Sequence, residues 1–257
     1  MPGSHFLLAF FPKLCYTLKK HSGAPPMKEQ QSDILQIAPV AYIETDFNEK
    51  FALPRQSGMC PDLCGRIRFT APFAHAEAVR ELDGFSHIWL IFGFSQNTWH
   101  GGSLTVRPPR LGGNRRVGVF ASRAPFRPNG LGLSCVRLLS VEYEENGAPL
   151  LLVGGVDLAN TTPIYDIKPY LPFSDCCRDA KPGYTALTQT HSLAVHCPPQ
   201  LLQKMTPQKA EALLQVLRQD PRPGYKTEDE AQYGFRYAGN EIKFTVKDGV
   251  LTVLQID

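Results

Sequence analysis

The sequence lacks the features that mark several large classes of protein. No run reaches the roughly 20 apolar residues that a membrane-spanning helix needs, so we expect no membrane association. No glycine-rich turn stands between a strand and a helix, and Gly112-Gly113 lacks that setting. A nucleotide-like cofactor, if the protein uses one, is therefore not held by a Rossmann domain. The chain also has no internal repeats.

The cysteines show no plan for disulfides or for a structural metal. There are seven, an odd number, at positions 15, 60, 64, 135, 176, 177 and 197. Three residues separate Cys60 from Cys64, and no second cysteine or histidine pair follows at zinc spacing. We therefore expect reduced thiols, no metal site and a cytoplasmic location.

Acidic residues are missing from one stretch of an otherwise ordinary composition. The chain has 257 residues, 43% hydrophobic and 20% charged, and its net charge of +3 is too small to identify a partner. Between residues 103 and 130, however, six arginines occur without an acid, at positions 107, 110, 115, 116, 123 and 127. Such a field attracts phosphate or carboxylate groups, although a plain solvated surface is the alternative.

The first 30 residues differ from the rest of the chain. The apolar run at residues 6–11 precedes its basic residues, which is the wrong order for a secretory signal. Met27 opens a more conventional start. We expect residues 1–30 to be a disordered extension, of which residues 1–26 have no folded role.

The next part of the chain, residues 31–173, predicts a mainly β fold. Proline- and glycine-containing loops separate short strand-like runs, as in an antiparallel β-barrel or closed sheet. Residues 72–82 have helical spacing. The expected strands cover residues 34–43, 65–69, 85–94, 117–121, 134–141, 151–156 and 164–170. In the third of these strands, His87 is expected to be a core histidine.

Residues 174–257 predict a small α+β C-terminal domain. Thr206-Pro207 is a strong helix start, and Asp220-Pro221 ends that helix. Three short strands follow at residues 233–237, 242–246 and 250–254. Lys247-Asp248-Gly249 joins the last two and is typical of a β-hairpin.

Two loops concentrate polar side chains. The first carries Arg123 and Arg127 between Pro125, Pro128 and two glycines, and proline fixes φ there. The second runs from Asp157 to Asp166 and includes Asn160, Thr161 and Thr162. The first loop is either a ligand site or a solvated arginine loop on a barrel rim, and the second is either a ligand site or a turn stabilised by its Asn and Thr side chains.

Several motifs, taken together and in order, resemble the TrmO or TsaA-like family over residues 34–257. They are Lys50-Phe-Ala-Leu-Pro-Arg-Gln56, Phe85-Ser-His-Ile-Trp89, Arg107-Pro-Pro-Arg110, Gly118-Val-Phe-Ala-Ser-Arg-Ala-Pro-Phe-Arg-Pro-Asn129, Asp166-Ile-Lys-Pro-Tyr-Leu-Pro172 and Asp220-Pro-Arg-Pro-Gly-Tyr225.

The resemblance implies a homodimeric β-barrel enzyme that uses S-adenosylmethionine to methylate tRNA. The implied acceptor is the exocyclic nitrogen of threonylcarbamoyladenosine, next to the anticodon of threonine tRNA. The donor contacts carried over by motif are Pro54, Arg55, Gln56, Ser95, Gln96, Arg123, Leu133, Asn160, Thr161, Thr162 and Pro163. We expect the arginines at 107, 110, 115, 116 and 127 to meet RNA phosphates, so that binding weakens with salt.

The acceptor nitrogen is urea-like and weakly nucleophilic, so a hydrogen-bond acceptor that takes its proton would help the transfer. Asp157 and Asp166 are the candidates for this role, and either could instead brace the loop.

The chain departs from the family pattern where Asn160-Thr161 replaces a common Asp-Gly, and also at Ser95 and Gly130. Two alternatives therefore stay open. One is a tRNA-binding relative without catalysis. The other is a methyltransferase that acts on another RNA or on a small molecule.

Overall fold

The computed structural model describes residues 35–97, 103–111, 115–187, 192–222 and 231–257. The prediction for residues 1–30 lies outside this part of the chain. Within the described residues, no helix is both long and apolar enough to cross a membrane.

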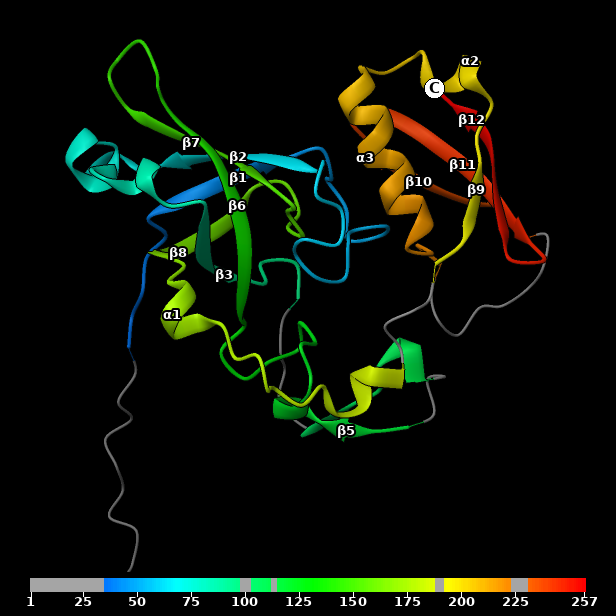
Figure 1. The fold of residues 1–257 in the computed structure, drawn as a ribbon, viewed down its shortest axis with the longest axis horizontal. Helices are drawn as coiled ribbons and strands as arrows, with labels where there is room; N and C mark the ends of the chain where they lie inside the picture. The colour runs from blue at the N-terminus through cyan, green and yellow to red at the C-terminus, as the bar shows by residue number, and fades with distance from the viewer. Residues whose placement is uncertain (1–34, 98–102, 112–114, 188–191, 223–230) are drawn as a thin grey trace, which may run out of the picture. The chain divides into compact units, whose positions relative to one another are not determined.

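The predicted antiparallel barrel is confirmed (Figure 1). Its six strands close in the order β1-β2-β7-β6-β3-β8, and each neighbouring pair is antiparallel. Alternate side chains point inward, as the twofold period of a strand requires; Ile88 and Leu90 of β3 are fully buried. The strands are β1 (Ala41–Thr45), β2 (Cys64–Phe69), β3 (His87–Gly93), β6 (Leu131–Tyr143), β7 (Pro149–Gly154) and β8 (Thr162–Pro169).

Three local expectations were wrong. Residues 72–82 form short 3-10 helices rather than one α-helix: the extended backbone of His75 separates the first two, and the left-handed Glu81, with φ of 66°, precedes the third. The first strand begins only at Ala41, after Pro39, which cannot donate to a strand ladder. His87 is exposed, and its Nδ1 lies 2.9 Å from the hydroxyl of Ser86. The helices in question are Ala71–Phe73, Ala76–Val79 and Leu82–Gly84.

The segment of residues 94–130, an excursion from the barrel, separates β3 from β6. It holds a two-stranded sheet of β4 (Thr105–Val106) and β5 (Val117–Gly118), with 3-10 helices at Pro109–Leu111 and Val119–Ala121. The strand expected over residues 117–121 therefore stops after two residues. This segment carries the arginine-rich stretch.

The C-terminal part forms a four-stranded sheet in the order β10-β11-β12-β9, with α3 over one face (Figure 1). The hairpin at Lys247 is confirmed, since Asp248 and Gly249 both have positive φ, as a tight hairpin turn demands. Pairing of β12 with β9 is parallel. The elements are β9 (Ala194–His196), β10 (Tyr233–Tyr237), β11 (Asn240–Lys247), β12 (Val250–Ile256) and α3 (Pro207–Arg218).

The predicted start of α3 is also confirmed. Thr206 is its N-cap, and the Thr206 hydroxyl accepts from the amide of Lys209 at 3.5 Å. Two further short helices, α1 (Pro172–Asp175) and α2 (Pro199–Leu202), and a 3-10 helix at Gly183–Leu187 lie in the connection before it.

One hydrophobic core runs through both sheets. Phe47, in the turn after β1, is fully buried, and its ring centroid lies 5.1 Å from that of Tyr237 and 6.2 Å from that of Phe235. Residues 37–257 accordingly form one compact unit. The barrel and the C-terminal sheet are therefore packed against each other through shared core side chains.

Candidate functional site

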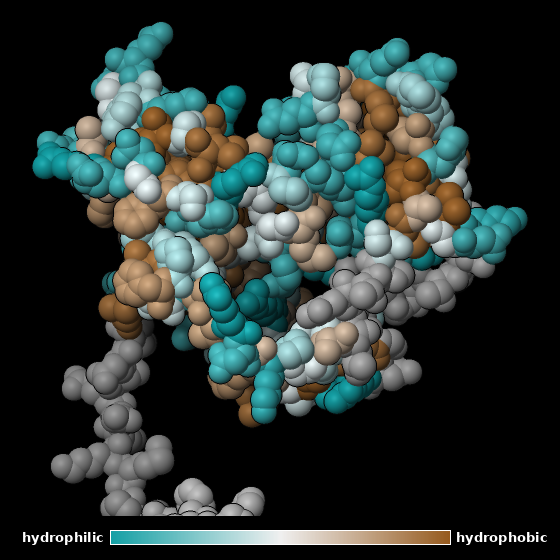
Figure 2. Space-filling view, in the orientation of Figure 1, coloured by the Kyte–Doolittle hydropathy of each residue, from teal (hydrophilic) through white to brown (hydrophobic). Residues whose placement is uncertain are grey.

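A large groove opens at the loops that join the barrel strands. Its volume is about 2250 Å³. Figure 2 shows a hollow near the centre of the view with hydrophilic and hydrophobic residues side by side around it. Its walls come from residues 50–56, Met59, Trp89, 91–97, Ser103, 105–109, Leu111, Arg116, 120–127, 131–134, 157–159, Thr162, Tyr184, Thr185, Val216 and 219–222.

Asp157 is the carboxylate at the floor of this groove. It follows β7, and its Oδ1 accepts a hydrogen bond from the Ser134 hydroxyl of β6 at 2.7 Å. Burial raises the pKa of Asp157, while the bonds from Ser134 and from the backbone of Ser57 and the nearby Arg123 oppose that rise. A carboxyl group with a raised pKa gains and loses its proton closer to neutral pH, which suits an acid or base.

Arg123 provides a cation on the same groove. Its side chain is exposed, and its guanidinium donates to the side-chain oxygen of Gln56. Both residues line the groove, although 67 positions separate them in the sequence. Gln56 thereby fixes the direction of the guanidinium, which retains donors for an anionic group.

A buried ion pair forms part of the wall near the end of α3. Arg222 contacts both carboxylate oxygens of Asp220, at 2.9 and 3.0 Å, and the two side chains are only 13% and 11% exposed. Arg55 donates to the backbone oxygen of Arg222 at 3.5 Å. The loop of Pro54–Gln56 is therefore tied to the C-terminal part of the chain.

The end of β3 contributes a polar edge. Lys50 donates to the backbone oxygen of Gln96 and, at 2.6 Å, to the side-chain oxygen of Asn97. Gln96 in turn donates to the carbonyl of Asn48 at 3.4 Å. Ser95 is exposed, and Ser95, Gln96 and Asn97 all line the groove. Leu133, 56% exposed on β6, adds an apolar surface.

The structure divides the predicted donor contacts into two groups. The residues that line the groove are Pro54, Arg55, Gln56, Ser95, Gln96, Arg123, Leu133 and Thr162. Asn160, Thr161 and Pro163 lie behind it in the same loop: Asn160 bonds to the turn after β1, and Pro163 is buried in β8. From the same stretch, Asp157, Leu158, Ala159 and Thr162 line the groove, and the Thr162 hydroxyl donates to the carbonyl of Ala159 at 2.7 Å.

Asp166 lies apart from Asp157. Its carboxylate is half exposed on β8, accepts from the amide of Ile167 at 2.9 Å, and lies 3.5 Å from the ammonium of Lys168. It is not among the groove residues. The structure thus brings only one of the two candidate bases to the groove.

The six arginines between residues 103 and 130 also differ in placement. Arg107, Arg116, Arg123 and Arg127 line the groove, whereas Arg115 is exposed outside it; of Arg110 only the backbone is described. Arg127 donates to the carbonyls of Ser122 and Val119, at 2.7 and 3.3 Å. Arg116 donates to the hydroxyls of Thr105 and Ser103, both at 2.8 Å. These bonds brace the excursion.

Three groove features escaped the sequence analysis. Lys50 and the Asp220–Arg222 pair stand in motifs quoted above, so a signal existed but no role was assigned to them. Ser134 carried no signal beyond its place at the start of the strand expected at residues 134–141. Its partnership with Asp157 depends on two barrel strands being neighbours, which only the fold reveals.

The described residues hold no group of three or more histidine, cysteine or acidic side chains that could bind a metal ion. All six cysteines among them are free thiols. Burial raises the pKa of Cys60 to about 12, so this thiol stays protonated at neutral pH.

Fold and groove together define a class of protein: a closed β-barrel with an arginine-bearing groove, to which the end of α3 in a small C-terminal α+β part contributes one wall. Residues 42–176 match the family described as the tRNA-methyltransferase O N-terminal domain, and residues 190–257 match the TrmO C-terminal domain. The chain therefore belongs to the TrmO family.

Relatives support this assignment. The tRNA (adenine(37)-N6)-methyltransferase of Escherichia coli is 41% identical over 201 residues, which cover 76% of this chain and 85% of the relative. The putative S-adenosylmethionine-dependent methyltransferase RcsF of Pseudomonas aeruginosa is 43% identical over 208 residues, covering 78% and 87%. The crystal structure of TrmO from Pseudomonas aeruginosa has a TM-score of 0.70 at 33% identity, covering 87% of this chain and 99% of the other.

Proposed function

We propose that this protein is an S-adenosylmethionine-dependent tRNA methyltransferase that methylates the exocyclic nitrogen of threonylcarbamoyladenosine next to the anticodon, most naturally in threonine tRNA. The observation that carries the proposal is that Gln56, Arg123 and Asp157, from three segments far apart in the sequence, line one groove. The names of the relatives support tRNA as substrate and S-adenosylmethionine as donor.

The groove residues fit the chemistry of this donor. Arg123, held by Gln56, suits the donor's carboxylate, because a guanidinium pairs with both oxygens of such a group. Leu133 and Pro54 give apolar surface for a ring, and the backbone and side chains of Ser95 and Gln96 offer polar partners. When bound, the donor supplies an electrophilic methyl group that the acceptor nitrogen attacks in line.

Asp157 is the better placed of the two candidate bases. Its carboxylate lies on the groove and keeps a raised pKa, while Asp166 is half exposed elsewhere on the barrel. We assign Asp157 the role of accepting the proton from the acceptor nitrogen, with Ser134 holding its Oδ1. Asp166 then braces β8 through the amide of Ile167.

The arginines of the excursion provide the surface for RNA. Arg107 and Arg116 line the groove, and Arg115 is exposed next to them. Phosphate contacts of this kind make binding fall steeply with salt. Phe126, 51% exposed on the same wall, offers a ring on which an unstacked base can lie. We further propose a cytoplasmic homodimer in which residues 31–173 and 174–257 are the two domains.

Calorimetric titration of the full chain with S-adenosylmethionine tests the donor assignment. We expect binding by the unaltered protein, loss of that binding in Arg123→Ala, and unchanged binding in Arg236→Ala, an exposed arginine on β10. If the folded, unaltered protein does not bind the donor but does bind tRNA, the protein is a tRNA-binding relative without catalysis.

A further inference from the structure

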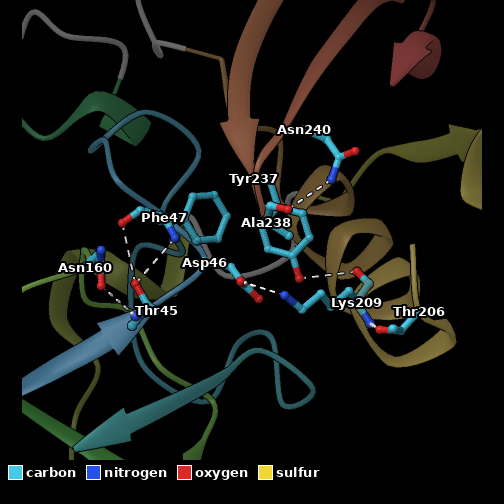
Figure 3. Close-up of polar contacts among 9 residues, drawn as sticks. All are labelled: Thr45, Asp46, Phe47, Asn160, Thr206, Lys209, Tyr237, Ala238 and Asn240. Atoms are coloured by element: carbon cyan, nitrogen blue, oxygen red, sulfur yellow. Dashed lines mark hydrogen bonds and ion pairs between the residues drawn. The ribbon is translucent and has the colours of Figure 1, made fainter. Parts of the chain in front are cut away.

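The turn after β1, residues 45–48, is hydrogen-bonded to residues 158–161 (Figure 3). This loop, called the donor loop, precedes Thr162 and contains two of the predicted S-adenosylmethionine contacts, Asn160 and Thr161. The amide of Asn160 donates to the carbonyl of Phe47 at 2.6 Å, and the side-chain oxygen of Asn160 accepts from the amide of Thr45 at 3.1 Å. The side-chain nitrogen of Asn160 donates to Asn48 at 3.0 Å. Asn160 is therefore satisfied at both ends of its side chain, which makes it part of the support of the loop.

Further bonds join the same two segments. The hydroxyl of Thr45 donates to the carbonyl of Leu158 at 3.1 Å, and in β1, just before the turn, the carbonyl of Ile43 accepts from the amide of Thr161 at 2.8 Å. Backbone and side chains thus connect the turn to residues 158–161 at several points. A shift of the turn must move the loop that carries Thr162 to the groove.

The other side of the turn is held by the C-terminal part of the chain (Figure 3). A carboxylate oxygen of Asp46 lies 2.9 Å from the ammonium of Lys209 on α3. The carbonyl of Asp46 accepts from the amide of Ala238, at the β10–β11 turn, at 3.0 Å. Phe47 packs on Tyr237, whose hydroxyl donates to the carbonyl of Lys209 at 3.2 Å.

Lys209 stands where a cation is ordinarily unfavourable. It lies in the first turn of α3, after the Thr206 cap, at the positive end of the helix dipole. The carboxylate of Asp46 offsets that repulsion. With side chains 43% and 28% exposed, the ion pair adds little to global stability, so its main consequence is geometric.

We propose that the C-terminal sheet and α3 position the donor loop of the barrel through the turn at residues 45–48, with Asp46 and Lys209 as positioning residues. The inference rests on the proposed function only in naming S-adenosylmethionine as the ligand of the loop. The bonds that connect α3, the turn and the loop are present without any ligand.

Hydrogen exchange on the full chain tests that connection directly. In Lys209→Met we expect faster exchange at the amides of Asn160 and Thr161, with the amides of β2 and β7 unchanged. Arg218→Met is the matched control, since it removes another exposed pair of α3, Arg218–Glu211 at 3.1 Å, away from the turn. Exchanging the two charges, Asp46→Lys with Lys209→Asp, should restore slow exchange.

Donor affinity gives the second measurement. Lys209→Met and Asp46→Asn should each weaken S-adenosylmethionine binding by about threefold to tenfold, a usual size for coupling through packed elements. The exchanged-charge variant should recover most of the loss, and Arg218→Met should show none.

The two measurements separate the possible failures. If Lys209→Met and Asp46→Asn fold and leave the exchange of Asn160 and Thr161 at the unaltered rate, the positioning role is refuted. If the unaltered protein does not bind the donor, the proposed function fails, while the exchange experiment still decides the connection. Faster exchange throughout the barrel would also refute it, because the pair would then support global stability only.

Discussion

Asp157 is the single side chain on which the proposed chemistry depends most. Replacement by Asn keeps an oxygen for the Ser134 hydroxyl but removes the base. We expect Asp157→Asn to slow methyl transfer by about 100-fold to 10,000-fold in single-turnover assays, the usual contribution of a general base. Asp166→Asn is the control and should retain most of the rate. An equal or larger loss in Asp166→Asn would assign the base to β8 instead.

The raised pKa of Asp157 also predicts a pH dependence of stability. Because the folded protein holds this proton more tightly than the unfolded chain, the contribution of Asp157 is full below the carboxyl group's ordinary pKa and falls as pH rises through the folded value. Asp157→Asn removes this dependence. The free energy of unfolding of the variant relative to the unaltered protein should therefore increase as the pH rises above the ordinary pKa of an aspartate carboxyl group, and level off above the raised pKa of the folded state. A constant difference would mean that burial does not perturb the group.

Thr161 carries backbone strain at a position where the family commonly has glycine. Its φ is 61°, a left-handed conformation that a β-branched residue rarely adopts. Thr161→Gly should stabilise the protein by about 1 kcal/mol in denaturant unfolding, since the relieved strain exceeds the added chain entropy. Asp248→Gly, at φ of 49°, should change stability less, because Asp tolerates this conformation. A destabilised Thr161→Gly would show that the Thr161 side chain supports the loop.

At the scale of elements, the loop of residues 54–58 depends on a close approach to the end of β7. The amide of Gly58 donates to the carbonyl of Gly155 at 2.8 Å, and a Cβ on Gly155 would lie 3.2 Å from the backbone of Gly58. Gly155→Ala should therefore displace the loop, cost about 1–3 kcal/mol in stability and weaken donor binding.

Gly58→Ala is the matched control for this substitution. Gly58 and Gly155 have similar φ values, 77° and 74°, but a Cβ on Gly58 would meet nothing within 4 Å. Both variants therefore carry similar backbone strain. The difference in their free energies of unfolding then measures the close contact of the Cβ at position 155 with the backbone of Gly58. Equal stability and equal donor affinity in the two variants would contradict the account of the loop.

Elements with strong local chemistry could be predicted from the sequence. The helix after Thr206-Pro207 and the hairpin at Asp248-Gly249 were predicted because capping and turn residues act within a few positions. The helix expected at residues 72–82 was wrong: the apolar spacing is present, but the extended His75 and the left-handed Glu81 divide the stretch into short 3-10 helices. The parallel pairing of β9 with β12 leaves no local pattern, and it was missed.

The candidate site was predicted residue by residue but not as an arrangement. Motif resemblance supplied Arg123 and Gln56, and the chemistry of the acceptor nitrogen suggested Asp157, yet the Gln56–Arg123 bond and the Ser134–Asp157 bond join residues far apart in sequence. For the same reason, the sequence could not predict that Asp157 lines the groove and Asp166 does not. Long-range contacts depend on strand order and register, which the barrel sets and a single sequence does not reveal.

At the scale of the whole molecule, barrel and C-terminal sheet act as one structure. Phe47, Phe235 and Tyr237 share a core, and residues 216–222 complete a groove built mostly by barrel loops. The arginine-rich stretch that stands out in the sequence lies on that groove. On the proposed function, the site for the methyl donor and the surface for RNA therefore share one groove.

Methyl transfer to defined tRNA tests the central claim most directly. Threonine tRNA with and without the threonylcarbamoyl group would be incubated with the full chain and S-adenosylmethionine, and the digested nucleosides would be analysed by mass spectrometry. The account predicts one added methyl group on the modified adenosine of the first tRNA, none on the second, and strong suppression in Asp157→Asn. Donor binding without methylation of the modified tRNA would contradict it.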